Sequence, residues 1–282
     1  MEITRNIDIS RLTTMGVGGT VSYFAEPEDG AELLNLLKWA QDRGIEIFIL
    51  GGGSDVIFDD RNFDILVISM KNFNGLEYLN SEVVAGAGVN LNKLLRENAT
   101  RGLSGMEELY GIPGTVGGAI AKNAGAHGRE IKDVLLWAKI LTEDGRIEKI
   151  PVENLGLKYR ESSFDGILLE AGLKLTDRPP ETIHRMMREF LKRRNESQPK
   201  GKTAGCIFKN PKPGLSSGYL LDRAGMKGYR VGDAMYSTVH ANFIVNLGNA
   251  RSAHVFELIE TGKRAVFEKF GIELKEEVVI IR

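Results

Sequence analysis

Short apolar runs separated by turn signals dominate the first 178 residues of the chain. Four of these runs are rich in apolar and β-branched side chains and predict strands. They are residues 45–50, 64–69, 82–85 and 167–175. Residues 134–142 and 146–150 flank an Asp-Gly dipeptide, which predicts a β-hairpin.

Two further segments carry apolar side chains at helical spacing. Residues 33–40 follow an acidic start at Asp29 and stop before Gly44, and residues 91–95 follow Asn90, a potential N-cap. Strands mixed with helices through residue 178 indicate an α+β or α/β domain.

Two adjacent prolines, Pro179 and Pro180, mark a change in organisation, because proline breaks helices and stiffens linkers. After them we expect a strongly basic helix, a second long helix loosened at Gly262, and two strands. These four elements are residues 181–195, 252–270, 243–247 and 277–281. The sequence therefore predicts two domains, residues 1–178 and residues 179–282, the second of α+β class.

The composition is that of an ordinary folded protein, with 42% hydrophobic and 27% charged residues. The formal net charge of −1, from 37 basic and 38 acidic side chains, argues against a nucleic-acid partner. The single cysteine, Cys206, excludes a disulfide framework and any four-cysteine metal site. No signal segment is visible, and no run approaches the roughly 18 apolar residues of a membrane helix. We therefore expect a cytoplasmic protein with no membrane partner.

Glycine is unusually frequent. It occupies 33 of the 282 positions, well above its usual share of about 7%. The glycines gather in clusters at residues 16–19, 51–53, 86–88 and 111–128. No cluster completes a known nucleotide motif. The dinucleotide fingerprint that would start at Gly51 fails at Val56. A P-loop ending at Thr203 would need a glycine where Glu196 stands.

The run at residues 111–119 (GIPGTVGGA) is too glycine-dense for a stable helix or strand interior. Backbone N–H groups beside small side chains approach anions closely. Tight turns explain any single cluster, but four clusters in one domain favour a large planar or polyphosphate cofactor lying against the backbone. The composition alone leaves open which cofactor that is.

The longest glycine-rich segment, GIPGTVGGAIAKNAGAHG, resembles the flavin-binding segment of the UDP-N-acetylenolpyruvoylglucosamine reductase family. Further matches follow in the family's order along nearly the whole chain. They are residues 13–14 before 18–19, 51–54, 159–164 (YRESSF), 205–211 (GCIFKNP), 237, 240–243 and 277–278. The short length resembles the branch without an extra substrate-covering segment.

The resemblance implies an α+β fold: a PCMH-type FAD-binding domain in two α+β subdomains, then a smaller substrate domain. Its last strand would return Glu277 to the active site. The implied activity is the NADPH-dependent reduction of UDP-N-acetylglucosamine enolpyruvate to UDP-N-acetylmuramate by non-covalently held FAD. This is a cytoplasmic step of peptidoglycan synthesis, and we expect the enzyme to be a monomer.

The resemblance also assigns site residues by matched motif positions. The implied catalytic residues are Arg160, Cys206 and Glu277. The implied cofactor-binding residues are Gly51, Gly52, Gly53, Ser54, Asp55, Gly86, Gly88, Gly111, Pro113, Gly114, Thr115, Gly117, Gly118, Asn123, Ala124 and Gly125. The implied substrate-binding residues are Tyr159, Lys209, Asn210, Ser237, His240 and Asn242. The four histidines show no metal-ligand spacing, so we expect no metal.

The implied chemistry suits these three catalytic residue types. Hydride addition beside a carboxylate builds negative charge, which the permanent charge of Arg160 would stabilise, with Glu277 assisting. Cys206 would donate the proton, since a thiol is a better acid than a hydroxyl. Serine is commoner in the family at this position, and Asp55, His127 and Asp233 are further departures from its pattern. A lone cysteine is otherwise most often a small buried apolar residue.

Two alternatives remain open. One is another PCMH-type flavoprotein oxidoreductase, such as an oxidase with covalent flavin. The other is a catalytically silent protein that binds a UDP-sugar. The basic helix, with five cationic side chains between Arg185 and Arg194, is either a solvated face or a pyrophosphate contact at its C-terminal end.

Overall fold

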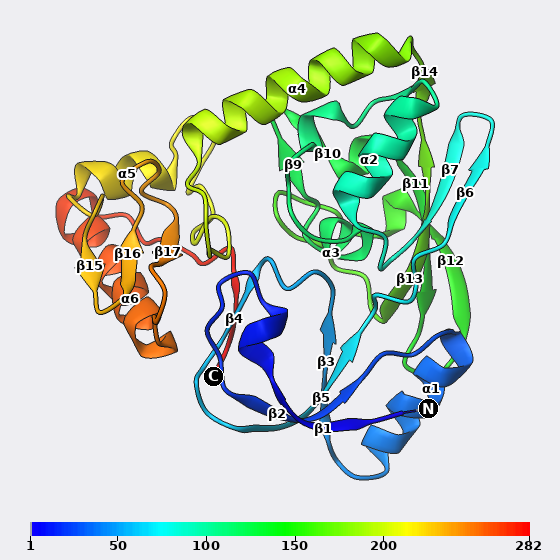
Figure 1. Cartoon of the computed structure of the whole chain (residues 1–282), viewed down its shortest axis with the longest axis horizontal. Coiled ribbons are helices and arrows are strands. Elements are labelled where there is room, and N and C mark those ends of the chain that lie inside the picture. The colour runs from blue at the N-terminus through cyan, green and yellow to red at the C-terminus, as the bar shows by residue number, and fades with distance from the viewer. Residues whose placement is uncertain (1) are drawn as a thin grey trace. The chain divides into compact units, whose positions relative to one another are not determined.

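The computed structural model describes residues 2–282, which form a mixed α+β protein as expected (Figure 1). The chain divides into two compact units. Unit 1 contains Tyr23–Gly52, Asp64–Arg193 and the first residues up to Arg5. Unit 2 contains Asn6–Ser22, Gly53–Phe63 and Arg194–Arg282. The units thus interleave along the sequence, whereas the predicted domains meet once, between residues 178 and 179.

Two antiparallel hairpins and a central strand form the larger sheet of unit 1, in the order β12-β11-β13-β7-β6. A second sheet has the order β1-β2-β5-β3, with β3 and β5 parallel. The strands of these sheets are β1 (Thr4–Asp8), β2 (Thr20–Ala25), β3 (Glu46–Leu50), β5 (Phe63–Ser69), β6 (Leu76–Leu79), β7 (Glu82–Gly86), β11 (Leu135–Leu141), β12 (Ile147–Pro151) and β13 (Ile167–Lys174). The four predicted strands, now β3, β5, β7 and β13, and the predicted hairpin, now β11 and β12, are confirmed.

Helices, 3₁₀ turns and two small ribbons complete unit 1. The helices are α1 (Gly30–Gln41), α2 (Leu91–Thr100), α3 (Val116–Ala121) and α4 (Pro180–Ser197), the last of which ends in unit 2. The 3₁₀ turns are Glu107–Leu109, Ile131–Asp133 and Val152–Asn154. Two small ribbons pair β8 (Leu103–Ser104) with β14 (Thr176–Asp177) and β9 (Gly125–Ala126) with β10 (Arg129–Glu130).

The predicted N-cap Asn90 is confirmed, and Asp29, predicted only as the acidic start of the first helix, is its N-cap. The Asp29 carboxylate accepts hydrogen bonds from the Ala31 and Glu32 N–H groups at the start of α1. The Asn90 side chain accepts from the Lys93 N–H at 3.0 Å at the start of α2. Each helix buries its apolar face in a core of unit 1.

The glycine-rich run does contain a helix, α3, so the prediction that glycine would exclude one is wrong. The Thr115 hydroxyl caps α3 by accepting from the Gly118 N–H at 3.3 Å. Val116 and Ile120 are fully buried, and this packing outweighs the roughly 1 kcal/mol by which each glycine disfavours a helix.

Pro180 is the first residue of α4 rather than part of a stiff linker, since proline fits the first turn of a helix. The preceding residues are ordered too: Arg178 donates its N–H to the Gly102 carbonyl at 2.8 Å. Ile183 and Met187 pack α4 into the core of unit 1.

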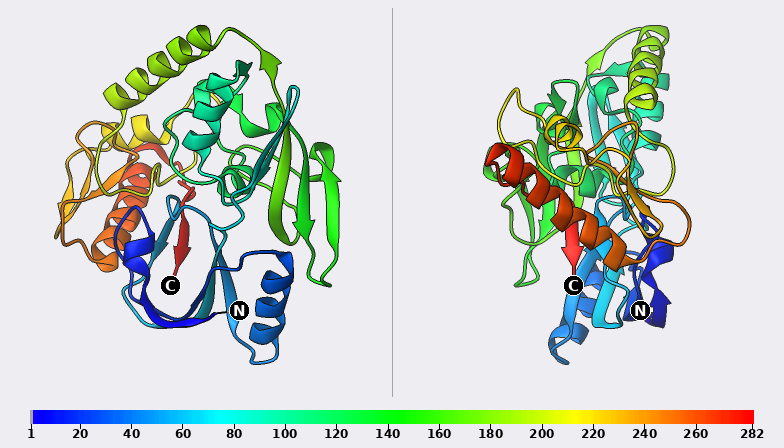
Figure 2. Two further views of the ribbon diagram at one scale, coloured as in Figure 1. Left: turned by 45° about the vertical axis from the view of Figure 1, so that its right-hand side comes forward. Right: turned by 90° about the vertical axis from the view of Figure 1, so that its left-hand side faces the viewer.

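Unit 2 is built around the long helix α6 (Ser252–Phe270), whose predicted bounds are confirmed. Its other elements are the 3₁₀ turn Ile9–Leu12, α5 (Ser217–Arg223), β4 (Val56–Phe58), β15 (Arg230–Val231), β16 (Ala234–Tyr236), β17 (Ile244–Asn246) and β18 (Val279–Ile281). β18, which is red in Figure 2, lies parallel to β4, whereas β15, β16 and β17 form an antiparallel sheet. The last strand therefore begins at Val279, two residues later than predicted.

Gly262 does not loosen α6, which is continuous through it. Gly262 instead makes room for Tyr236, whose fully buried hydroxyl donates to the Leu258 carbonyl at 3.0 Å. A Cβ at position 262 would overlap that hydroxyl. Burial also raises the pKa of Tyr236 far above its ordinary value, so the hydroxyl keeps its proton.

We therefore expect Gly262→Ala to destabilise the protein by about 1–3 kcal/mol through overpacking, although alanine is the better helix former. Urea unfolding of the purified variants measures this free energy. Tyr236→Phe removes the hydroxyl, so the double variant should lose less stability than the two single losses combined. Simple additivity would contradict the packing explanation.

Candidate functional site

Three of the predicted glycine loops meet in unit 1. A Cβ at Gly52 would lie 2.6 Å from the Gly114 Cα, so the two backbones are in direct contact. The Gly117 N–H donates to the Ala87 carbonyl at 2.8 Å, and the Val116 N–H donates to the Val89 carbonyl at 2.9 Å. Residues separated by more than 60 positions therefore form one glycine-lined surface.

Many N–H groups of this surface are used inside the chain. Gly86 and Gly88 donate to the Gly75 and Phe73 carbonyls, and a Cβ on either glycine would overlap backbone. Their role in the structure is the close approach of two chain segments. This commitment of the N–H groups limits the anion contacts that the clusters suggest.

Gly118 differs from its neighbours. It is exposed, and a Cβ there would meet only the Thr115 hydroxyl at 3.6 Å, which is ordinary contact. The protein itself therefore has room for a side chain at Gly118, so internal packing does not require glycine there. Asn92, which the sequence analysis missed, holds the loop beside it: its side chain accepts from the Gly111 N–H and donates to the Ile112 carbonyl.

Arg160 lies in a tight turn in which Lys158 and Glu161 exchange backbone hydrogen bonds. Its φ of +56° is in the left-handed region, where a residue other than glycine costs about 1 kcal/mol or more. Such strain persists only when surrounding contacts hold it, and it is concentrated at functional positions.

The turn is held against the end of the glycine-rich run. The Arg160 Nη2 donates to the Gly125 carbonyl at 2.6 Å, and the Ser162 hydroxyl donates to the Ala121 carbonyl at 2.8 Å. Asn123 is fully buried and donates to the Lys158 carbonyl at 2.9 Å. Unit 1 therefore joins the predicted catalytic arginine to the predicted cofactor-binding residues 123–125. Tyr159 is exposed beside it, with its ring centroid 5.3 Å from the Arg160 guanidinium carbon.

Cys206 and Glu277 lie in unit 2, where the backbone places them next to each other. Cys206 forms a bridge with Phe243, and the next residue, Ile207, accepts a hydrogen bond from the Glu277 N–H at 2.7 Å. The adjacent Glu276 forms an ion pair with Lys263 on α6.

Side chains of residues 237–242 form hydrogen bonds to the backbone, and the Asn242 amide pairs with Phe208 in the way that a neighbouring strand would. The Asn242 amide accepts from the Phe208 N–H at 3.0 Å and donates to the Phe208 carbonyl at 2.8 Å, and it is almost fully buried. The Ser237 hydroxyl accepts from the Val239 and His240 N–H groups. The Asn242 and Ser237 side chains therefore already form hydrogen bonds within unit 2.

His240 is half-buried, and its Nδ1 accepts from the Asn242 N–H at 3.2 Å. Burial, and then the charge of Lys227, lower the pKa of His240, so the ring is neutral near pH 7. Lys209 and Asn210 lead into α5: the Ser217 hydroxyl donates to the Lys209 carbonyl at 2.5 Å, and its N–H donates to the Asn210 side chain at 3.0 Å.

The remaining predicted cofactor residues, Gly53, Ser54 and Asp55, belong to unit 2. The Gly53 carbonyl accepts from the Thr14 N–H, and the Asp55 carbonyl accepts from the Val279 N–H that begins β18. Among residues 2–282, one buried side-chain polar atom lacks a partner, the Thr203 hydroxyl three residues before Cys206. A polar group of a ligand would satisfy it.

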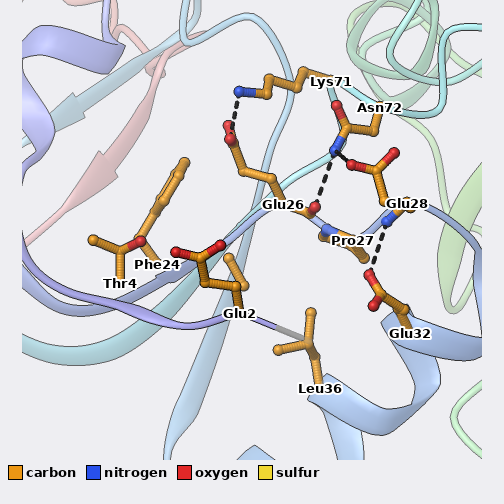
Figure 3. Close-up of a pocket in the computed structure, with 11 residues that line it drawn as sticks. Glu2, Thr4, Phe24, Glu26, Pro27, Glu28, Glu32, Leu36, Lys71 and Asn72 are labelled. Atoms are coloured by element: carbon orange, nitrogen blue, oxygen red, sulfur yellow. Dashed lines mark hydrogen bonds and ion pairs between the residues drawn. The ribbon is translucent and has the colours of Figure 1, made fainter.

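A pocket of about 510 Å³ in unit 1 contains none of the predicted site residues. It is lined by Glu2, Thr4, Phe24, Ala25, Glu26, Pro27, Glu28, Glu32, Leu36, Lys71 and Asn72 (Figure 3). Lys71 pairs with Glu26, and Asn72 donates to the Glu28 carboxylate at 2.9 Å. Four carboxylates against one ammonium repel a phosphate-bearing ligand, so this pocket is separate from the candidate site.

Within residues 2–282, no cluster of three or more His, Cys, Asp or Glu side chains could hold a metal ion. Over the same range, no helix combines the length and apolarity required to cross a bilayer.

Comparisons with known proteins match both parts of the chain. Residues 21–151 match the model of an FAD binding domain, which confirms the expected class of cofactor domain. Residues 197–281 match the UDP-N-acetylenolpyruvoylglucosamine reductase C-terminal domain.

Similar proteins extend the match to the full length. The UDP-N-acetylenolpyruvoylglucosamine reductase of Rubrobacter xylanophilus is 38% identical over 97% of this chain and 93% of its own. The crystal structure of the Thermus caldophilus reductase is 39% identical, covers 100% of this chain and 98% of its own, and has a TM-score of 0.84. A 6-hydroxy-D-nicotine oxidase from Arthrobacter nicotinovorans, at 19% identity over 62% of this chain and 42% of its own, with a TM-score of 0.51, shares only the fold. By these full-length matches, the chain belongs to the UDP-N-acetylenolpyruvoylglucosamine reductase family.

Proposed function

We propose that this protein is an FAD-dependent reductase that uses NADPH to convert UDP-N-acetylglucosamine enolpyruvate to UDP-N-acetylmuramate, a cytoplasmic step of peptidoglycan synthesis. The observation that carries the proposal is Arg160, which is strained and hydrogen-bonded to Gly125 of the glycine-rich run. An arginine fixed beside a cofactor surface suits a substrate with a carboxylate next to the carbon that accepts a hydride.

The residues present fit FAD. Gly52, Gly114 and Gly118 have no side chain that would keep a cofactor away from the backbone, and Asn123 holds the turn at Lys158 against the end of the glycine-rich run. When bound there, FAD would supply hydride transfer from NADPH to the enol-ether carbon of the substrate.

Arg160 would bind the substrate carboxylate with its guanidinium and stabilise the negative charge that builds beside it. Its Nη2 is already oriented by the Gly125 carbonyl, so the side chain does not have to be ordered during the reaction. Glu277 would assist at the same carboxylate, by hydrogen bonding to it or to the developing charge.

Cys206 would donate the proton. The S–H bond of its Sγ breaks, the substrate carbon gains the proton, and the electron pair remains on sulfur as the thiolate. Half-burial and the backbone bridge to Phe243 fix its position.

The substrate-binding residues divide into two groups. Tyr159, Lys209 and His240 are proposed to contact the substrate. Asn242, Ser237 and Asn210 are proposed to act by holding the 206–210 segment, because their side chains are engaged with backbone groups.

A visible spectrum of the purified protein, followed by NADPH oxidation with and without the enolpyruvyl substrate, tests the proposal. We expect a yellow protein that loses its flavin on denaturation and oxidises NADPH in step with the substrate. Flavin that survives denaturation would indicate an oxidase of the same scaffold. A colourless protein that binds the UDP-sugar would indicate a silent binding protein.

Gly118→Val should lower flavin occupancy strongly while the protein remains folded, because the structure has room for the side chain and the cofactor surface does not. The ratio of flavin to protein absorbance measures occupancy. Gly75→Val is the matched control, since Gly75 is exposed with nothing within 4 Å of an added Cβ. Full occupancy in Gly118→Val would place the cofactor elsewhere.

Cys206→Ala should leave the reduction of the flavin by NADPH near the unmodified rate, because that step needs no proton donor. Reoxidation by the enolpyruvyl substrate should slow by about 10²–10⁴-fold, the usual effect of a positioned general acid. Cys206→Ser should retain more activity than Cys206→Ala.

Stopped-flow absorbance measures the two half-reactions separately. If Cys206 is only a packed apolar residue, the alanine variant loses some stability while both rates survive. Reoxidation of Cys206→Ala at the unmodified rate would assign the proton to another group.

A further inference from the structure

The Gly125 carbonyl that binds Arg160 belongs to the ribbon of β9 and β10, each of which has two residues. Glu130 lies opposite Gly125 in this ribbon, and Arg129 lies opposite Ala126. A two-stranded ribbon of this size has little stability of its own. Contacts outside the ribbon must therefore hold the carbonyl that Arg160 uses.

The ribbon and the segment before it also carry backbone strain. His127, in the turn between β9 and β10, has a φ of +51°, and Asn123 has a φ of +40°. Both values lie in the left-handed region, as does that of Arg160 itself. Such residues persist only where the surrounding structure over-determines them. The ribbon therefore needs an anchor in the rest of unit 1.

Arg129 provides this anchor. Its side chain is half-buried, and its Nε donates to the Gly105 carbonyl at 2.9 Å. The 104–105 segment is itself fixed by the almost fully buried Glu107 carboxylate, which accepts from the Gly105 N–H at 2.9 Å and the Ser104 hydroxyl at 2.5 Å. A hydrogen bond from a charged donor is stronger than a neutral one. The Arg129 side chain therefore fastens β10 to a buried part of unit 1.

Gly125 lies in close contact with both arginines. A Cβ at Gly125 would lie 2.8 Å from the Arg129 carbonyl oxygen, 2.8 Å from the Glu130 Cγ and 3.2 Å from the Arg160 Nη1. Packing this close transmits small displacements instead of absorbing them. A shift of β10 would therefore move the Gly125 carbonyl, to which the Arg160 Nη2 donates at 2.6 Å.

Other contacts of the arginine turn act on its backbone. Asn123 donates to the Lys158 carbonyl, and the Ser162 hydroxyl donates to the Ala121 carbonyl. These two hydrogen bonds hold the turn in place, whereas the bond to Gly125 holds the guanidinium itself. The direction of the guanidinium is therefore sensitive to the ribbon in a way that the position of the turn is not.

We propose that Arg129 is a positioning residue for the catalytic arginine. By fastening β10 to the Gly105 carbonyl, it holds the Gly125 carbonyl in the place that orients the Arg160 guanidinium. The inference rests on the proposed function for its catalytic meaning. Its physical content is the coupling of two arginine side chains through the ribbon.

Arg129→Met keeps the apolar stem and removes the hydrogen-bond donors. Reoxidation of the flavin by the enolpyruvyl substrate should slow by about 10–100-fold, the effect of a small misplacement of a positioned group. Flavin occupancy and reduction by NADPH should stay near the unmodified values, because hydride transfer from NADPH involves no carboxylate. Arg129→Lys keeps a charged donor and should recover most of the reoxidation rate.

Arg43→Met is the matched control. It removes another guanidinium bond to a backbone carbonyl of unit 1, that of Trp39 at 3.1 Å on α1. Both half-reactions should keep their unmodified rates in this variant. If Arg43→Met slows reoxidation as much as Arg129→Met does, a general loss of stability explains the effect and the proposal is wrong.

A double variant separates positioning from a structural role. Arg160→Met has no guanidinium to orient, so adding Arg129→Met should slow reoxidation no further. The same fold-loss with and without Arg160 would overturn the proposal, as would equal slowing of flavin reduction by NADPH.

The side-chain N–H signals of Arg160 in the NMR spectrum of the holoenzyme give a readout that needs no substrate. Arg160→Met identifies them by their absence. In Arg129→Met their exchange with solvent should be about tenfold faster, because the Gly125 carbonyl no longer holds Nη2. Unchanged exchange contradicts the coupling of the two arginines. A protein that does not oxidise NADPH with the enolpyruvyl substrate contradicts the proposed function instead, and the exchange measurement still tests the coupling.

Discussion

The contact between backbone segments at Ala87 and Gly117 is the constraint on which the candidate cofactor surface depends. The Gly117 N–H reaches the Ala87 carbonyl, and a Cβ at position 117 would lie 2.9 Å from the Ala87 Cβ. Only glycine allows two backbones to meet at this distance without moving one of them. Because α3 starts here, the contact also fixes Gly118 and the direction in which the chain continues to Asn123.

The strained turn at Arg160 also depends on the direction in which the chain leaves α3 toward Asn123. A left-handed arginine is unfavourable in isolation, so the turn needs contacts that exceed its cost. Hydrogen bonds from Arg160, Ser162 and Asn123 join the turn to residues 121–125. Each hydrogen bond contributes about 1 kcal/mol, so together they exceed the strain. The glycine-rich run therefore has two roles: it forms the surface and it holds the arginine.

The sequence predicts those structural features that depend on residues close together in the chain. The helix Ser252–Phe270 and the caps Asp29 and Asn90 follow from periodicity and capping, which are properties of neighbouring residues. Helix α3 was missed because burial of Val116 and Ile120 outweighs the low helix propensity of glycine. The membership of residues 6–22 and 53–63 in unit 2 is equally non-local, since it depends on contacts with segments that follow 130 or more positions later. Motif resemblance identified Arg160, whereas its backbone strain is visible only in three dimensions.

A cysteine at position 206 is more sensitive to nearby charges than a serine at the same position would be. A serine hydroxyl remains neutral at every physiological pH, so a nearby cation affects it little before the proton is transferred. A thiol titrates within a few units of neutrality, and a neighbouring guanidinium changes both its acidity and the fraction that still carries a proton. Too strong an interaction would deprotonate the donor before the substrate needs it.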